Sequence, residues 1–494
     1  MKMCAHVGSV CALAGSVCVW CAVASLLAPR ARTTRTRSFT EDSILFSPPA
    51  SVITMRTLPA SWLHRPVGRG ATGARSRLLA TLAALSSTPL GSIGLDELRT
   101  AKRLAVEQTW PHKLGVEDFL QRGGRLPSGG EGGGAGGVGA AAAPIIDVRA
   151  PCEYAKGHVP GAISVPLFTD DERAEVGTLY KQVGRDAAVE RGLELVDAKG
   201  VERLLVEPLA AHGVQLAHGD DILVYCFRGG MRSGSIAWLL SQCEDDALGV
   251  HTLDGGYKRF RQWALDTWEE CDRPVVIVGG PTGSGKTDVL HALRDDLGEQ
   301  MLDLEGMANH RGSIFGALGR PPQPSNEHYE NLLALEWRGF SSERPVYIED
   351  ESHNVGKCGV PRGLWHRMRA KEAQVMRLNV PHEARVAKLV SEYGVYPPSE
   401  IADCVRGLVK RLGHDQVNEM CAALEDHQPP KLAQVAETLL TDYYDSMYAY
   451  QAKKRAEEQS GGEEAVEVLC AGGNAIDNAR ALRDALIEAT GCGN

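Results

Sequence analysis

Residues 274–287 read PVVIVGGPTGSGKT, an apolar run that leads into a glycine-rich turn and then into a stretch with helical spacing. The turn matches the pattern GxxxxGK[ST] through Gly280, Gly283, Ser284, Gly285, Lys286 and Thr287. In a strand–loop–helix context this pattern predicts a phosphate-binding loop, because the glycines let backbone N–H groups surround two phosphates. Lys286 would neutralise the phosphates and Thr287 could hold Mg²⁺. The motif predicts a phosphate-bearing ligand, but it identifies neither the ligand nor its fate.

A second apolar run, VYIEDE at 346–351, ends in three acids. Such a strand end is where a carboxylate on the metal side of a bound phosphate is expected, and Asp350 is our first choice. Solvated surface acids at a strand end explain any one of the three equally well. We predict no metal-ligating residues as such, although Mg²⁺ could bind beside the phosphates.

Upstream of the phosphate loop, residues 225–233 read YCFRGGMRS between an apolar strand and a helical run. A cysteine at the carboxyl end of a parallel strand faces the crevice in which α/β sheets bind ligands. Arg228, Arg232 and the following helix N-terminus would favour the thiolate of Cys226, and the glycines would turn backbone N–H groups inward. Cys226 is therefore the predicted nucleophile; the alternative is an inert buried thiol.

The 494 residues divide into a predicted order of units. Apolar runs at 145–148, 221–226 and 250–256 alternate with helical patterns and predict a parallel α/β domain over 100–272, with a glycine-rich insertion at 123–144. An α/β domain with the phosphate loop follows over 273–400. Residues 401–494 are predicted to be a helical C-terminal region, in which a Gly/Glu-rich break at 460–464 precedes a last strand and helix.

Residues 1–99 differ from the rest in charge: they hold eleven Lys/Arg and four Asp/Glu, whereas the whole chain has a net charge of -10. An uncharged stretch at 3–28 is followed by Arg- and Ser-rich sequence, and residues 43–95 contain no acid. This composition is typical of a presequence that targets a protein to a plastid or mitochondrion. After its removal we expect no stable association of the protein with a membrane. There are two alternatives. The N-terminal residues could be a gene-model extension of a cytoplasmic protein, or the apolar stretch could be a permanent membrane anchor. Thirteen irregularly spaced cysteines indicate a reducing compartment.

The first α/β domain resembles rhodanese domains. The resemblance rests on DVR at 147–149, EY at 153–154, GHVPGA at 157–162 and DGGY at 254–257, and it places Cys226 at the loop cysteine that carries sulfur or selenium in those domains. Asp147 and His158 are expected to hold the loop and strand ends together.

The whole body resembles the tRNA 2-selenouridine synthase family, from about Leu114 to Leu482. Six stretches carry this resemblance: CFRGGMRSGSIAWLL (226–240), GTLYKQVGRDAA (177–188), GPTGSGKT (280–287), LDLEGMANHRGSIFGALG (302–319), QPSNEHYENLLA (323–334) and EDES (349–352). The resemblance implies a rhodanese-like domain followed by a P-loop NTPase-like domain with a helical extension.

It also implies an activity and its substrates. The enzyme would replace sulfur by selenium at C2 of the wobble 2-thiouridine of tRNA, with selenophosphate as donor. A geranyl group from geranyl diphosphate would first alkylate the sulfur and so create a better leaving group. On this reading the phosphate loop holds geranyl diphosphate and Cys226 carries or delivers selenium.

The RNA would need a local basic surface, since the body is acidic. Residues 362–388 hold seven Lys/Arg and two Glu, and Trp365 could stack on a base. A solvated helix face with a buried Trp is an equal alternative.

Other functions that fit the motifs are a rhodanese-type sulfurtransferase and a P-loop kinase or ATPase regulated by a rhodanese module.

Overall fold

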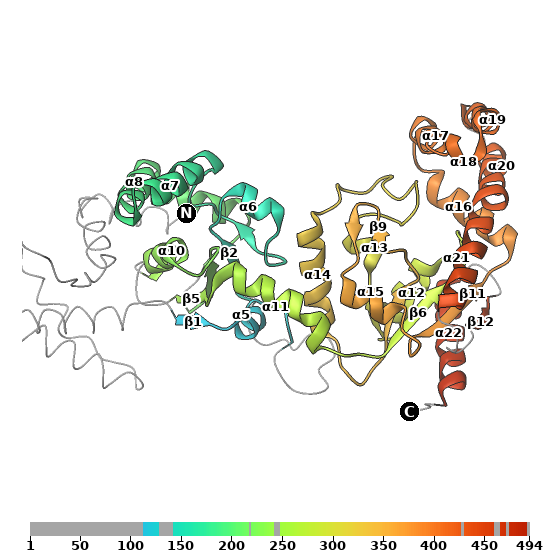
Figure 1. Cartoon of the computed structure of the whole chain (residues 1–494), viewed down its shortest axis with the longest axis horizontal. Helices are drawn as coiled ribbons and strands as arrows, with labels where there is room; N and C mark the ends of the chain where they lie inside the picture. Colours follow the sequence, from blue (N-terminus) through green and yellow to red (C-terminus); the bar gives the residue numbers. More distant parts are fainter. Residues whose placement is uncertain are drawn as a thin grey trace, which may run out of the picture.

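The computed structural model describes residues 112–127, 142–216, 219–241, 248–425, 429–458, 465–470 and 474–491. In this part of the chain two sheet-based units lie next to each other, followed by a helical extension (Figure 1). The predicted targeting region and most of the glycine-rich insertion (128–141) lie outside the described residues. None of the described helices combines the length and the apolar character needed to cross a bilayer.

The first unit contains a five-stranded parallel sheet in the order β1-β5-β4-β2-β3. Its central strands coincide with three apolar runs of the sequence, as predicted. The strands are β1 (His112–Leu114), β2 (Ile145–Asp147), β3 (Ile163–Ser164), β4 (Asp221–Tyr225) and β5 (Gly249–Leu253).

Helices cover both faces of this sheet. The side chains of each strand point alternately to the two faces, so both faces carry apolar residues that need covering. Ile145 and Leu223 pack towards α5 (Val116–Arg122) and α11 (Gly256–Glu270). Ile146 and Val224 pack on the other face, towards α8 and α10. The remaining helices are α6 (Pro151–Lys156), α7 (Asp170–Gln182), α8 (Arg185–Lys199), the π-helical turn η2 (Glu202–Val206), α9 (Glu207–Ala211) and α10 (Met231–Ser241).

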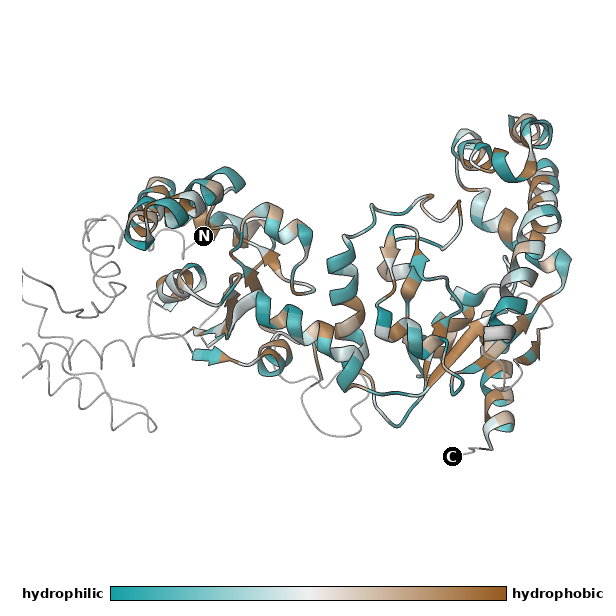
Figure 2. Ribbon diagram, viewed as in Figure 1, coloured by the Kyte–Doolittle hydropathy of each residue, from teal (hydrophilic) through white to brown (hydrophobic). Residues whose placement is uncertain are grey.

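The second unit contains another five-stranded parallel sheet, in the order β12-β11-β6-β8-β7. Figure 2 shows its central strands in the brown of apolar residues, as expected for a sheet covered on both faces. The strands are β6 (Val275–Gly279), β7 (Gln300–Leu302), β8 (Val346–Glu349), β11 (Gln374–Asn379) and β12 (Val466–Leu469), with a separate hairpin of β9 (Asn354–Val355) and β10 (Cys358–Gly359).

The C-terminal region is helical as predicted, but its last strand and helix return to the second sheet. Strand β12 pairs with β11, and α22 packs on α12 through Leu482 and Leu486. The helices of the second unit and the extension are α12 (Lys286–Asp295), α13 (Leu304–Met307), α14 (Asn326–Gly339), α15 (Arg362–Met368), α16 (His382–Tyr393), α17 (Pro398–Arg406), α18 (Val409–Leu412), α19 (His414–Glu425), α20 (Pro429–Leu439), η3 (Leu440–Tyr444), α21 (Asp445–Glu458) and α22 (Ala475–Thr490).

One hydrophobic core runs through both units. Helix α11 of the first unit packs on α14 of the second, and Trp268 and Trp337 lie at this contact with ring centroids 5.7 Å apart. Polar contacts surround it: the Tyr257 hydroxyl donates to Glu327 (2.8 Å), and Asn331 donates to the same hydroxyl (2.9 Å). The two sheets are therefore held against each other by a packed interface.

Candidate active sites

The Cys226 loop lies at the carboxyl edge of the first sheet, as predicted. Cys226 follows β4 directly, and residues 227–230 bend before α10 begins. The Cys226 side chain is 3% exposed and its Sγ lies 3.2 Å from the Ser233 hydroxyl. The sulfur thus lies at the base of the loop, while Phe227 and Arg228 project to solvent.

Backbone contacts shape this loop. Tyr257 N donates to Cys226 O (2.9 Å), which fastens the loop to the glycine pair that follows β5. A Cβ on Gly256 would lie 2.3 Å from both Cys226 O and Gly229 N, so only glycine allows this approach. The N–H groups of residues 227–230 donate to no other group of the described chain, and a bound anion could accept from them.

The two predicted arginines differ in their surroundings. Arg228 is exposed on the loop, with its guanidinium 5.9 Å from the Phe227 ring centre. Arg232 instead turns to Glu153, with Nη1 2.8 Å from Oε2, and this carboxylate also pairs with Arg173. Arg228 is thus the loop cation available to a ligand, whereas Arg232 ties α10 to α6.

A buried ion pair braces the strand ends beside the loop. Arg149 donates to both carboxylate oxygens of Asp147 and to Gly157 O, and Tyr225 donates to the same carboxylate (2.8 Å). Asp147 therefore holds β2 and β4 ends together, as expected. His158 does not join this network; its ring stacks between Tyr154 and His328, with centroids 3.8 Å from each.

The phosphate loop has the conformation that its sequence predicts. Gly283 and Gly285 have φ of 82° and 75°, and α12 begins at Lys286. Lys286 Nζ donates to Gly280 O (3.0 Å), so without a ligand the ammonium folds back onto its own loop. The Ser284 hydroxyl is buried and has no hydrogen-bond partner among the described residues.

Of the two neighbouring acids, Glu349 is the one that contacts the phosphate loop directly. Thr287 donates to Glu349 Oε1 (2.7 Å), whereas Asp350 turns to Arg369 (3.1 Å) and Arg455. Asp350 still lines the same pocket, but its charge is matched by two guanidinium groups. Asp350 therefore stays a predicted residue of the phosphate-loop pocket, while Glu349 is the carboxylate that contacts Thr287.

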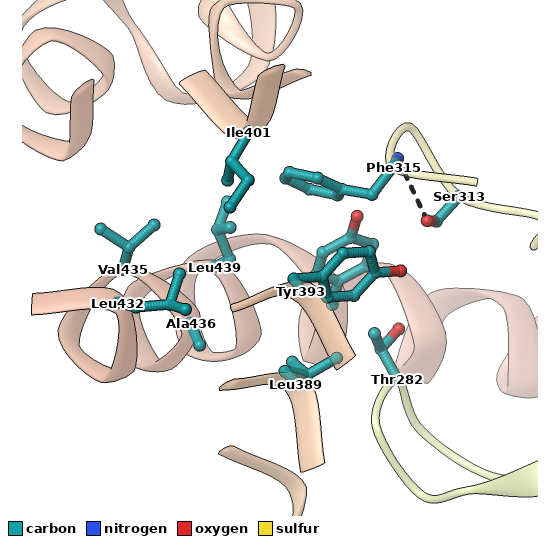
Figure 3. Close-up of a pocket in the computed structure, with 11 residues that line it drawn as sticks. Thr282, Ser313, Phe315, Leu389, Tyr393, Ile401, Leu432, Val435, Ala436 and Leu439 are labelled. Atoms are coloured by element: carbon teal, nitrogen blue, oxygen red, sulfur yellow. Dashed lines mark hydrogen bonds between the residues drawn. The ribbon is translucent and has the colours of Figure 1, made fainter. Parts of the chain in front are cut away.

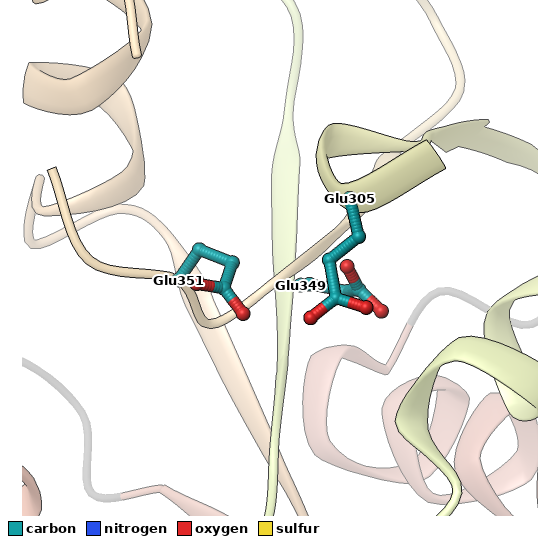
Figure 4. Close-up of side chains that lie close together, drawn as sticks. All are labelled: Glu305, Glu349 and Glu351. Carbon is teal, nitrogen blue, oxygen red and sulfur yellow. The ribbon is translucent and has the colours of Figure 1, made fainter. Parts of the chain in front are cut away.

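Glu349 belongs to a cluster of three carboxylates (Figure 4). Its partners are Glu305, from α13, and Glu351, and one oxygen of each lies within 4.8 Å of the others. Burial raises the pKa of Glu305 to about 8, with a further contribution from the Glu351 charge. Burial and the Glu349 charge raise the pKa of Glu351 to about 7, and the pKa of Glu349 is raised as well. The cluster therefore holds protons at neutral pH when no cation is bound.

This donor set fits Mg²⁺. Mg²⁺ prefers oxygen ligands and binds through one or two carboxylates beside substrate phosphates. Glu349 Oε2 is buried and has no hydrogen-bond partner in the part of the chain that the structure describes, and the Thr287 hydroxyl adjoins both Glu349 and Glu305. Sequence analysis missed Glu305, although it lies in the quoted stretch 302–319, because nothing local shows that α13 faces the loop.

Most cations of the stretch 362–388 are occupied within the protein. Arg367 pairs with Asp272, Arg377 with Glu467 and Lys388 with Asp288. Arg385 is buried and donates to Thr282 O of the phosphate loop (2.9 Å), so it supports that loop. Trp365 is half-buried in the phosphate-loop pocket, with the Arg369 guanidinium 4.2 Å from its ring centre. These contacts favour the alternative of a structural rather than an RNA-binding stretch.

Comparisons with known proteins match both sheet-based units. The rhodanese-like domain family matches residues 136–262, and the AAA domain of tRNA 2-selenouridine synthase matches residues 273–472. A tRNA 2-selenouridine synthase of Shewanella loihica is 37% identical over 343 residues, covering 64% of this chain and 88% of the relative. A Pseudomonas putida synthase is 37% identical over 376 residues, covering 69% and 95%. The chain therefore belongs to the tRNA 2-selenouridine synthase family.

Proposed function

We propose that this tRNA 2-selenouridine synthase works in two steps, with prenylation at the phosphate loop and selenium transfer at the Cys226 loop. The substrates would be a tRNA with 2-thiouridine at the wobble position, geranyl diphosphate and selenophosphate. The observation that carries the first assignment is an apolar slot beside the phosphate loop (Figure 3).

The slot is apolar, which is the surface chemistry that a prenyl chain would contact. It runs from Thr282 of the loop to side chains of the helical extension and is lined by Phe315, Leu389, Tyr393, Ile401, Leu432, Val435, Ala436, Leu439 and Tyr444, with Ser313 at its mouth. The slot alone is narrow, about 40 Å³, but it shares Thr282, Leu389 and Tyr393 with the phosphate-loop pocket of about 590 Å³. A diphosphate in the loop would therefore have apolar surface within reach of its organic part.

In the first step the thiocarbonyl sulfur attacks the first carbon of geranyl diphosphate. The carbon–oxygen bond breaks, diphosphate leaves with the electron pair, and N3 of the base loses its proton. Gly283, Gly285, Lys286 and Thr287 would hold the diphosphate, and Mg²⁺ at Glu305 and Glu349 would help to neutralise its charge. Lys286 would exchange Gly280 O for a phosphate oxygen.

In the second step selenium, in its −2 state in selenophosphate, attacks C2. The carbon–sulfur bond breaks and the geranylthiolate leaves and takes up a proton. Water then cleaves the selenium–phosphorus bond, which gives phosphate and 2-selenouridine, and N3 regains its proton. The N–H groups of residues 227–230 and the Arg228 guanidinium would hold the phosphate oxygens of selenophosphate. The selenium atom would then lie next to the Cys226 thiol at the base of the loop.

Two substitutions test this division. Lys286→Ala should lower prenylation of 2-thiouridine tRNA at least about 100-fold, by loss of a charge at the diphosphate, yet leave a pre-geranylated tRNA able to accept selenium. Cys226→Ser should show the opposite pattern, and Cys152→Ser, at an exposed cysteine, serves as its control. Nucleoside analysis after single turnovers measures both steps. Equal loss of both steps in both variants would falsify the division, and ATP consumption without 2-selenouridine would support the kinase alternative.

A further inference from the structure

A second large cavity lies in the first unit, under the hairpin of α7 and α8. Its volume is about 860 Å³, within the range of cavities that hold small organic ligands. Helix α7 buries none of its thirteen residues, and α8 buries only Ala188, Gly192 and Val196. The hairpin thus covers a hollow instead of packing tightly on the sheet.

The wall and the rim of this cavity differ in chemistry. Phe168, Val189, Leu193, Val196, Ile236 and Leu239 supply an apolar wall. Six basic residues and two acidic ones also line the cavity; the basic ones are Arg149, Lys156, Arg173, Lys181, Arg185 and Arg232, and the acids are Glu153 and Glu327. Four of the cations, at 156, 173, 181 and 185, are exposed; of these, Lys156 pairs with Glu327 (3.2 Å) and Arg173 with Glu153 (3.2 Å).

The cavity adjoins the selenium-transfer site. Phe227 and Met231, from the loop and the first turn of α10, lie in its lining next to Cys226. The stretch 177–188, one of those that carry the family resemblance, forms the end of α7 and the start of α8 and contributes Gly177, Tyr180, Lys181, Arg185 and Ala188 to the lining. Neither chemical step described above assigns a role to this stretch.

We infer that this cavity holds the prenyl chain of the S-geranylated wobble nucleoside during selenium transfer, with anticodon phosphates at the cationic rim. The inference rests on the proposed function, because only a prenylated substrate brings an apolar chain to the Cys226 loop. The group that leaves C2 carries that chain, so the chain must lie near the loop when selenium attacks. The apolar wall and the positive rim match the two parts of such a substrate.

The cavity would also order the two steps. A 2-thiouridine without a prenyl group leaves the apolar wall unfilled, so it binds this site less tightly than the alkylated nucleoside does. Prenylation at the phosphate loop would therefore act as the entry requirement for selenium transfer.

The test compares two variants of the same hairpin on a stem-loop RNA with S-geranyl-2-thiouridine at the wobble position. Val189→Trp fills the cavity, whereas Val183→Trp adds the same bulk at an exposed position outside the lining. We expect Val189→Trp to raise the KM for the geranylated RNA about tenfold or more, the factor that loss of a few buried methylene contacts produces. Val183→Trp should behave like the wild type, and both variants should keep prenylation of 2-thiouridine RNA, which also reports that they fold.

A second measurement uses the unaltered protein. We expect S-geranyl RNA to bind at least about tenfold better than S-methyl RNA, since methyl leaves the cavity empty. Equal KM values for the two RNAs, or for Val189→Trp and Val183→Trp, would overturn the cavity assignment while the proposed function stands. No conversion of S-geranyl RNA by the wild type would instead overturn the proposed function.

Discussion

Glu349 shows how one side chain can link fold and chemistry. As the last residue of β8 it lies where the phosphate loop, α13 and the strand end meet, and it accepts the Thr287 hydroxyl proton in a hydrogen bond. A buried carboxylate costs stability when charged, so it is retained where a cation or proton can neutralise it. This reasoning makes Glu349 the residue at which the metal hypothesis is best tested.

At the residue scale we predict that Glu349→Gln removes the response of the protein to Mg²⁺. In the wild type, millimolar Mg²⁺ with diphosphate should raise the melting temperature by several degrees through mass action. The variant should melt at least as high as the wild type without Mg²⁺, because an amide replaces a carboxylate that costs stability whenever it is ionised, but it should not respond to the ion. Glu343→Gln, at an exposed position, is the control. An unchanged Mg²⁺ response in Glu349→Gln would exclude this site.

The same cluster gives the pH dependence its sign. The pKa of Glu305 is raised to about 8 and that of Glu351 to about 7, so the folded state binds more protons than the unfolded chain above the ordinary pKa near 4.5. Stability without Mg²⁺ should therefore fall as pH rises from about 5 to about 8. Since Mg²⁺ needs the ionised carboxylates, its stabilising effect should grow over the same interval. Thermal melts at pH 6 and pH 8, with and without Mg²⁺, measure both trends.

At the scale of elements, the sequence patterns predicted the positions of the strands well, but they did not predict which side chains would meet around those strands. The runs at 145–148, 221–226 and 250–256 are the central strands, because buried parallel strands need continuous apolar sequence. The partners of Asp350 could not be predicted: Arg455 lies 105 positions away, on a helix whose placement depends on the whole extension. The burial of Arg385 under the phosphate loop is of the same kind, since charge alone indicated a surface patch.

The return of β12 and α22 to the second sheet also makes a prediction at this scale. Leu482 of α22 is fully buried against α12, the helix that carries Lys286 and Thr287 at its start. Leu482→Ala should lower the free energy of unfolding by about 2–5 kcal/mol, as large-to-small core substitutions do. Arg480→Ala, on the exposed side of the same helix, should change it by less than about 0.5 kcal/mol. Urea unfolding measures both, and equal effects would show that α22 is not part of the core.

At the scale of the whole molecule, the shared core predicts that the two units unfold together. Trp337 of α14 is fully buried, lies 5.7 Å from Trp268 of α11, and donates to Cys271 O at the junction of the units (3.0 Å). Arg338 beside it pairs with Glu270 (2.6 Å), so polar and apolar contacts cross the same boundary. The positions of the Cys226 loop and the phosphate loop relative to each other therefore depend on this interface.

Trp337→Ala should lower the free energy of unfolding by about 3–5 kcal/mol, the cost of a large aromatic truncation, and this loss should be felt in both units. Hydrogen exchange of amides in β4 and in β6 measures each unit separately, and exposed Tyr450→Ala provides the control. In the wild type the slowest amides of both strands should exchange by the same global opening, because one hydrophobic core at α11 and α14 is shared by both units. If Trp337→Ala speeds exchange in β6 alone while β4 keeps its protection, the units are independent. The two steps proposed above would then require the tRNA to move between two separately moving sites.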